Sequence, residues 1–144
     1  MESKPSLPTQ LLRLFFLLLM ALTGGAKLLD MPGFVAVVAS YQSLPAAITA
    51  PSAWALALTE VGFALWLATG KQLRLAALAL IAMHLLYLGW QVIALARGLH
   101  LPNCGCFGVY WVRPLTWFSP LEDLVLLVLA LMFLRGTHAA RGAR

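Results

Sequence analysis

The 144-residue chain has too few charged residues to cover the surface of a water-soluble domain. Hydrophobic residues make up 62% of it and charged residues 10%, whereas a soluble domain carries about 25% charged residues. This composition excludes a soluble enzyme, a disordered regulator and a disulfide-framework toxin, and it places the chain in a lipid bilayer. In a membrane protein the formal net charge of +5 reflects topology and does not indicate nucleic acid binding.

Four apolar stretches predict an all-α integral membrane protein, built as a bundle of four transmembrane helices in a single domain over residues 1–144. The stretches cover residues 11–29, 51–69, 73–96 and 119–134. A helix rises about 1.5 Å per residue, so about 20 residues cross a hydrocarbon core of ~30 Å. The first three stretches are long enough, and two aromatic residues, Trp117 and Phe118, extend the fourth into the interface.

Local signals mark the ends of these helices. Pro51 favours a helix start, and Gly70 and Gly98 each favour a helix end. The string Ser-Pro-Leu-Glu at residues 119–122 is typical of a capping box. Residues 135–144 then form a basic tail. Small residues late in the first stretch resemble a signal-peptide cleavage site, but the apolar stretch is long, which favours an uncleaved helix.

The distribution of Lys and Arg predicts the orientation. If four helices alternate across the membrane, seven of the ten basic residues fall on one side, and Lys27, Arg97 and Arg113 fall on the other. The positive-inside rule then places both termini in the cytoplasm and the protein in the cytoplasmic (inner) membrane. The segment 31–45 is apolar but too short to span, so we expect a short helix at the outer interface.

Both cysteines lie in the outward loop after the third helix, in the string Pro-Asn-Cys-Gly-Cys-Phe-Gly at residues 102–108. The compartment outside a bacterial inner membrane is oxidising, so Cys104 and Cys106 are candidates to form or exchange a disulfide. Three alternatives remain: inert thiols, a structural disulfide, which would close almost no loop, and a metal site that recruits His100. Cys104 is expected to be the more exposed thiol and the attacking one, whereas an apolar setting should raise the pKa of Cys106.

The sequence resembles the MauE-like branch (methylamine utilisation protein E) of the DoxX-like membrane proteins. The most specific part of the resemblance is the string Cys-Gly-Cys-Phe-Gly, and further matching positions are residues 25–30, Phe34, Val38, Tyr41, residues 44–45 and Glu60. The resemblance implies a membrane protein that supports maturation of a disulfide-rich periplasmic enzyme subunit, together with a thioredoxin-like partner. The pair Glu-Asp at residues 122–123 departs from the family pattern.

Ionisable residues inside the spans are costly and are therefore functional candidates. Glu60 and His84 lie near the middle of the second and third helices, and we expect them to contact each other. His84, Tyr87 and Gln91 recur at helical spacing and share one face. Lys27 is placed to pair with Asp30. These side chains either bridge helices structurally, or they form a proton path or a quinone-headgroup site connected to the thiols.

The leading hypothesis is a membrane thiol–disulfide redox protein that uses Cys104 and Cys106 as a thiol–disulfide oxidoreductase would. Its partners would be the bilayer, a periplasmic thioredoxin-like protein and a disulfide-containing client, with a quinone as a possible electron carrier. No dinucleotide fingerprint or haem-attachment motif is present in the sequence. Two alternatives stay open: a non-catalytic assembly subunit, and a small proton-coupled exporter that uses Glu60.

Overall fold

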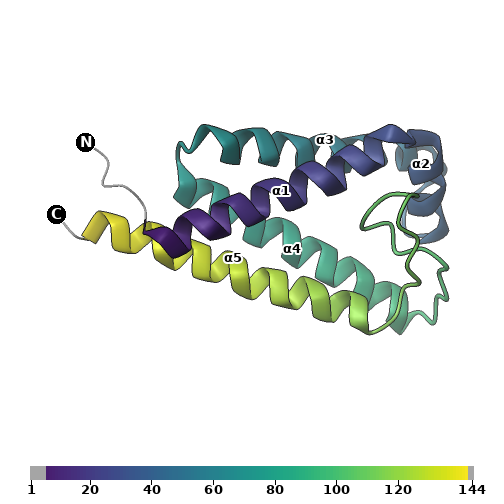
Figure 1. Cartoon of the computed structure of the whole chain (residues 1–144). Helices are drawn as coiled ribbons and strands as arrows, with labels where there is room; N and C mark the ends of the chain where they lie inside the picture. Colours follow the sequence, from purple (N-terminus) through teal and green to yellow (C-terminus); the bar gives the residue numbers. More distant parts are fainter. Residues whose placement is uncertain (1–5, 143–144) are drawn as a thin grey trace.

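The computed structural model describes residues 6–142, and within this part of the chain the regular secondary structure is entirely helical (Figure 1). Three helices are long and apolar enough to cross a membrane, which confirms an all-α membrane protein. They are α1, α3 and α4. The complete set is α1 Leu7–Leu29, α2 Met31–Ser40, α3 Ala46–Thr69, α4 Leu73–Ala96 and α5 Phe118–Gly142.

The four long helices form a bundle made of two closely packed pairs. α1 packs along α3, and α4 packs along α5, while the consecutive helices α3 and α4 touch each other little. Where the pairs meet, Phe16, Leu67, Leu80 and Phe133 are completely buried. Helices α1 and α3 are in close contact at Gly24, where an added Cβ would lie 2.9 Å from Val61. Small residues at such crossings allow close packing of membrane helices.

The outer surface of the bundle is apolar, as contact with lipid requires. Long aliphatic side chains are exposed on each long helix, including Leu18 on α1, Leu58 on α3, Leu85 on α4 and Val128 on α5. In a soluble protein, exposed apolar patches of this extent would be an aggregation hazard. In a bilayer they face hydrocarbon at no such cost.

Three predicted helix boundaries are wrong. The helix expected to start at residue 11 starts at Leu7, and it has a proline in its first turn, where proline is well tolerated. The helix expected to start at Pro51 starts at Ala46, so Pro51 lies inside α3. Proline removes one backbone hydrogen bond and is best tolerated near a helix start; Pro45 precedes α3, and its carbonyl accepts a hydrogen bond from Thr49. The expected tail also differs, because α5 continues to Gly142, whereas residues 143–144 lie outside the described part.

The expected capping box does not form at the start of α5. The side chain of Glu122 pairs with Arg113 in the preceding loop, and it does not return to the helix start. By contrast, the glycine signal at the end of α3 is confirmed. Gly70 adopts a left-handed φ of 69° and its N–H donates to the carbonyl of Leu67, and Arg13 also donates to this carbonyl.

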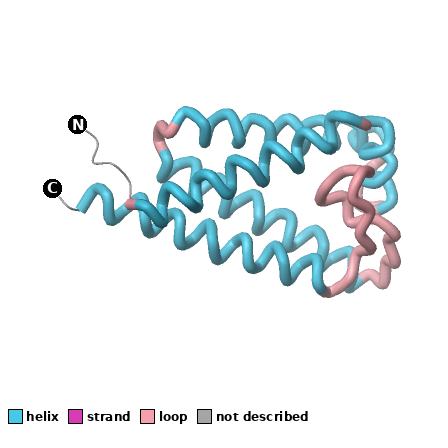
Figure 2. Tube along the Cα trace, in the orientation of Figure 1, coloured by secondary structure: helices cyan, strands magenta, loops and turns pink. Residues whose placement is uncertain are grey.

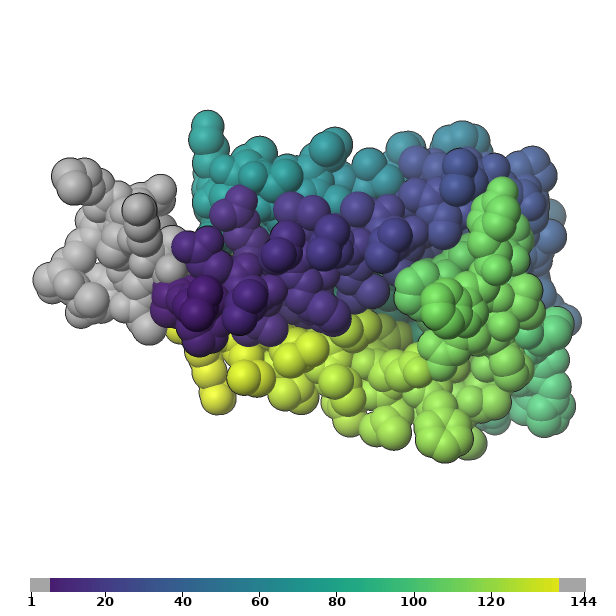
Figure 3. Space-filling model, in the orientation of Figure 1, coloured from purple at the N-terminus to yellow at the C-terminus, as the bar shows by residue number. Residues whose placement is uncertain are grey.

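One end of the bundle is covered by α2 and by the loop between α4 and α5 (Figure 2). The short helix expected within residues 31–45 is confirmed as α2, and the carboxylate of Asp30 caps it by accepting from the N–H of Gly33 at 2.9 Å. The space-filling view shows the loop lying directly against the ends of α1 and α2 (Figure 3). The start of α1 and the end of α5 lie at the opposite end (Figure 1). The loop end is the one that carries the cysteines.

Candidate functional site

Hydrogen bonds from three sides hold the loop that carries the cysteines in place. Within the loop, the N–H of Cys104 donates to the carbonyl of Arg113 at 2.7 Å. From α2, the hydroxyl of Tyr41 donates to the carbonyl of Cys104 at 2.8 Å. From α1, the ammonium of Lys27 donates to the carbonyl of Cys106 at 2.9 Å. Burial raises the pKa of Tyr41, so its hydroxyl remains a donor at neutral pH.

The two glycines of the Cys-Gly-Cys-Phe-Gly string are required by backbone conformation and by close packing. Gly105 has φ of 79° and Gly108 has φ of 63°, a region that favours glycine. At Gly108 an added Cβ would lie 3.0 Å from the carbonyl oxygen of Ala26 in α1. At Gly105 it would lie 2.8 Å from a methyl group of Val37. The string therefore fits tightly against α1 and α2.

The two thiols face each other. Their Sγ atoms lie 3.0 Å apart in a hydrogen bond, and both cysteines are free. The hydrogen bond from Cys106 and the positive charge of Arg113 lower the pKa of Cys104 from 9.0 to about 6. The same hydrogen bond, together with burial, raises the pKa of Cys106. The lowered pKa favours Cys104 as the thiolate of the hydrogen-bonded pair.

The expected exposure of the two cysteines is wrong, although the expected order of their pKa values agrees with the structure. Cys104 is the more buried residue, at 8% exposed, and Cys106 is only partly buried. Cys104 is covered because it packs with Tyr41 and Leu101 beneath the loop. The low pKa of Cys104 therefore comes from a neighbouring donor and a cation, and solvent exposure does not explain it.

A buried ion pair lies next to the loop. The Nζ atom of Lys27 donates to both carboxylate oxygens of Glu60, at 2.8 and 2.6 Å, and the hydroxyl of Tyr87 donates to one of them at 2.7 Å. Lys27 is 4% exposed and Glu60 is 1% exposed. The expected pairing of Lys27 with Asp30 is wrong, because Lys27 points into the bundle and Asp30 caps α2. Together with Tyr87, the Lys27–Glu60 pair links α1, α3 and α4 at one point.

A second polar cluster lies on the other side of the cysteines. Nδ1 of His84 and Oδ1 of Asp123 lie 3.1 Å apart, and the side-chain amide of Gln91 donates to the other oxygen of Asp123. The expected contact between Glu60 and His84 does not form, since each has a different partner. Among the described residues, Nε2 of His84 and Oε1 of Gln91 are buried without a hydrogen-bond partner. Sequence reasoning missed Asp123, whose acidic side chain at a helix start looks like an ordinary first-turn residue.

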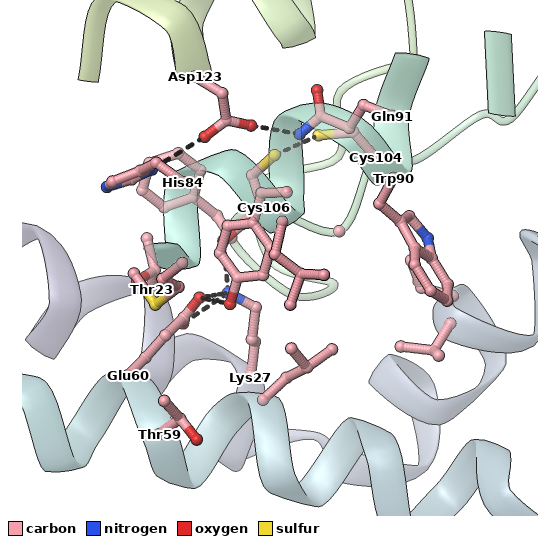
Figure 4. Close-up of a pocket in the computed structure, with 18 of the residues that line it drawn as sticks. Thr23, Lys27, Thr59, Glu60, His84, Trp90, Gln91, Cys104, Cys106 and Asp123 are labelled. Atoms are coloured by element: carbon pink, nitrogen blue, oxygen red, sulfur yellow. Dashed lines mark hydrogen bonds and ion pairs between the residues drawn. The ribbon is translucent and has the colours of Figure 1, made fainter. Parts of the chain in front are cut away.

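Both clusters and both cysteines line one cavity of about 400 Å³ (Figure 4). Figure 4 shows the Cys106 thiol between Asp123 and the Lys27–Glu60 pair. Asp30 and His100, which were also singled out from the sequence, are not part of the cavity wall. The other candidates all line it: Lys27, Glu60, His84, Tyr87, Gln91, Cys104 and Cys106. Most of the remaining wall is apolar, with Phe34, Trp90 and Leu56 among its members.

Within residues 6–142, no group of three or more His, Cys, Asp or Glu side chains is arranged to hold a metal ion. The chemistry of the cavity wall is instead that of a dithiol beside a buried cation, a carboxylate and a phenol.

Comparison with known proteins places the chain in a family. The sequence profile described as "Methylamine utilisation protein MauE" matches residues 6–136. The chain belongs to the MauE family. A relative in Paracoccus denitrificans, named methylamine utilization protein MauE, is 32% identical over 129 residues, which cover 90% of this chain and 69% of the relative. No solved structure matches the chain.

The matched region of this MauE-family chain contains the whole candidate site. Residues 6–136 include the Lys27–Glu60 pair, the cysteine loop and Asp123, so the cavity forms entirely within the segment that defines the family. Family membership and three apolar helices of spanning length together identify a membrane protein. Its polar groups are concentrated around the cavity and its apolar groups face outward, as expected for a site built inside a membrane bundle.

Proposed function

We propose that the protein is a membrane thiol–disulfide oxidoreductase in which Cys104 and Cys106 alternate between a dithiol and a disulfide. The observation that carries the proposal is the pair of facing thiols, 3.0 Å apart, of which one has a pKa of about 6. Reactive cysteines in proteins are marked by such lowered pKa values, whereas buried structural cysteines are inert. The loop holds both sulfurs beside a cavity and is anchored by Tyr41 and Lys27.

The proposal includes a topology. α5 is the fourth span, because it packs along α4 and exposes apolar side chains such as Leu124 and Val128. Both termini then lie in the cytoplasm, on the side that carries most of the Lys and Arg residues. The cysteine loop lies at the extracytoplasmic face of the inner membrane, in an oxidising compartment.

In this topology the partner is a soluble thioredoxin-like protein that carries electrons from a client. A thiolate of the partner attacks the Cys104–Cys106 disulfide, the partner's second thiol resolves the mixed disulfide, and Cys104 and Cys106 are left reduced. Attack falls on the sulfur of Cys106, and Cys104 leaves as the thiolate because a thiol of lower pKa is the better leaving group. The partner gains a disulfide that it passes to an enzyme under maturation.

The name of the relative in Paracoccus denitrificans connects this chemistry with methylamine utilisation. We include that context in the proposal: the client is a disulfide-containing enzyme subunit of amine metabolism. The alternative of an exporter that uses Glu60 loses support, because the carboxylate of Glu60 is held by Lys27 and Tyr87.

Trapping of the mixed disulfide tests the proposal. In the variant Cys104→Ser, the thiol of Cys106 can attack the disulfide of an oxidised partner and form a mixed disulfide, with release of the partner's second thiol. Because Cys104 is missing, no disulfide can form within the protein, and the adduct can only revert. Cells are quenched in acid, and the adduct is isolated and identified by mass spectrometry. The matched variant Cys106→Ser should yield far less adduct, since its remaining sulfur is buried. If neither variant forms an adduct while the wild-type thiols stay reduced in cells, the protein is not an oxidoreductase.

A further inference from the structure

The cavity between α3 and α4 is open on the flank of the bundle, where lipid lies. Three residues of its wall are exposed on that flank: Ala55 and Thr59 on α3 and Leu86 on α4. The opening exists because α3 and α4 pack against α1 and α5 rather than against each other. An apolar molecule dissolved in the bilayer can therefore enter the cavity sideways without crossing water.

The inner part of the cavity reaches the thiols. Cys104, Gly105 and Cys106 form part of its wall, together with the polar group of Lys27, Glu60 and Tyr87 (Figure 4). The volume of about 400 Å³ lies within the range of ~300–1,000 Å³ that is usual for sites of small organic ligands. A ligand of this site must have an apolar body that suits the aliphatic and aromatic wall, and polar atoms that suit the ammonium and the phenol.

The chemistry of the thiols narrows the ligand further. Under the proposed function, each turnover leaves Cys104 and Cys106 reduced, and a new disulfide requires an acceptor of two electrons and two protons at the same place. A molecule that is soluble in lipid, has a flat apolar ring with two carbonyl oxygens, and takes up two electrons and two protons is a quinone.

We propose that the cavity binds the head group of a lipophilic quinone, which enters from the bilayer between α3 and α4 and reoxidises Cys104 and Cys106. This inference rests on the proposed function. In the reaction the two sulfurs lose their protons and an electron pair, and an S–S bond forms between them. The two carbonyl groups of the quinone take up the electron pair and two protons, so that the products are one disulfide and one quinol.

The buried cation beside the site suits this reaction. Negative charge develops on a quinone oxygen as the sulfur donates electrons, and a fixed positive charge or a phenol in a site without water stabilises such charge strongly. Lys27 supplies the positive charge, and its N–H donors are engaged by Glu60 and by the carbonyl of Cys106, as the hydroxyl of Tyr87 is by Glu60. Among the described residues, the buried wall atoms without a hydrogen-bond partner are Nε2 of His84 and Oε1 of Gln91, and these are free to bond the quinone or quinol oxygens. A site that binds only the acyl chain of a lipid is expected to have an apolar wall, because an acyl chain makes no polar contacts with a buried ion pair.

The test uses the full-length protein, reduced, freed of reductant and reconstituted in lipid nanodiscs without oxygen. The probe is a benzoquinone with a ten-carbon tail. Quinol formation is followed by ultraviolet absorbance, and protein thiols are counted by alkylation and mass spectrometry. We expect one quinol for each disulfide formed. A parallel reaction with a soluble disulfide reagent, added from the aqueous side, reports thiol exchange independently of the cavity.

A pair of adjacent leucines gives the matched variants. Leu86 is 59% exposed and lines the cavity mouth, whereas Leu85 is 52% exposed and is not part of the cavity wall. Leu86→Trp should slow quinol formation at least tenfold and leave exchange with the soluble disulfide unchanged. Leu85→Trp should leave both rates unchanged, which also shows that a tryptophan on this surface is tolerated.

The outcomes separate the two proposals. If the thiols exchange with the soluble disulfide but no quinol forms, the quinone site is refuted and the oxidoreductase remains. If quinol forms equally fast in Leu86→Trp and Leu85→Trp, the quinone reacts elsewhere and the assigned cavity is wrong. If the wild-type thiols react with neither reagent, the proposed function itself fails.

Discussion

The hydrogen bond between the two sulfurs makes the reactivity of Cys104 depend on Cys106. The bond is the largest cause of the lowered pKa, and the positive charge of Arg113 adds to it, whereas burial acts in the opposite direction. In the variant Cys106→Ala the donor is absent and burial remains. The pKa of Cys104 should then return from about 6 to its ordinary value of 9.0 or higher.

The size of the effect follows from two opposing factors. At pH 7 the thiolate fraction is about 90% for a pKa of 6 and about 1% for a pKa of 9, so the variant loses a factor of about 90. A more basic thiolate is a better nucleophile, and a Brønsted coefficient of about 0.4–0.5 over three pKa units returns a factor of about 15–30. Alkylation of Cys104 should therefore be about three- to sixfold slower in the variant at pH 7. Above about pH 8 the order should reverse, because the thiolate fraction of the variant then exceeds about one-fifteenth, and the variant should react faster than the wild type.

The assay is the rate of modification by a small uncharged alkylating reagent between pH 4 and pH 11. In the wild type, peptide mass spectrometry distinguishes Cys104 from Cys106. Modification of wild-type Cys104 should rise with pH through about 6 and then level off. Cys106→Ser is the matched control, because its hydroxyl still donates and should retain part of the shift. A Cys106→Ala protein whose Cys104 still titrates near 6 would show that the neighbouring thiol is not the cause, and the reasoning about the site would fail.

Two further predictions concern the ion pair and the topology. Lys27→Met leaves the carboxylate of Glu60 buried without its cation, which should lower the stability by about 3–5 kcal/mol, and adding Glu60→Leu should recover most of this loss. Thermal unfolding in detergent measures both variants, and Lys71→Met, at an exposed lysine, is the control. A Lys27→Met protein as stable as the wild type would contradict the buried ion pair. A membrane-impermeant maleimide applied to intact, reduced spheroplasts should label the cysteines of the loop, which lie outside the membrane in this topology. Labelling that appears only after permeabilisation would place the loop in the cytoplasm and refute the topology.

Local sequence signals predict the helix ends well where a residue such as glycine favours termination by its own backbone conformation. The helix at residues 73–96 is confirmed at both ends, and Gly70 ends the preceding helix with the left-handed conformation that glycine favours. The predictions fail where packing overrides a local signal. Pro51 is tolerated within α3, and Glu122 pairs with Arg113 instead of closing a capping box.

The sequence predicts which residues belong to the site better than it predicts which of them form hydrogen bonds with one another. Helical spacing places His84, Tyr87 and Gln91 on one face, and all three line the cavity. Spacing does not determine which partner each finds, because the partners come from other helices. Lys27 bonds to Glu60, which is 33 positions away, rather than to its near neighbour Asp30. Asp123 bonds to His84 across 39 positions, a contact that depends on how α4 and α5 pack.

The environments of the two cysteines differ, and this difference suits a site that lies between the aqueous phase and the lipid. Residue Cys106 is partly exposed, whereas residue Cys104 is buried and packs with Tyr41. Both line a cavity that opens toward lipid. Exchange with a partner needs an accessible sulfur and a good leaving group, and the asymmetry of exposure and pKa assigns these tasks to different residues. Lys27 donates to the carbonyl of Cys106 and to both carboxylate oxygens of Glu60 in the cavity wall. The same side chain therefore helps to fix the position of the cysteine loop and places an ion pair beside the thiols.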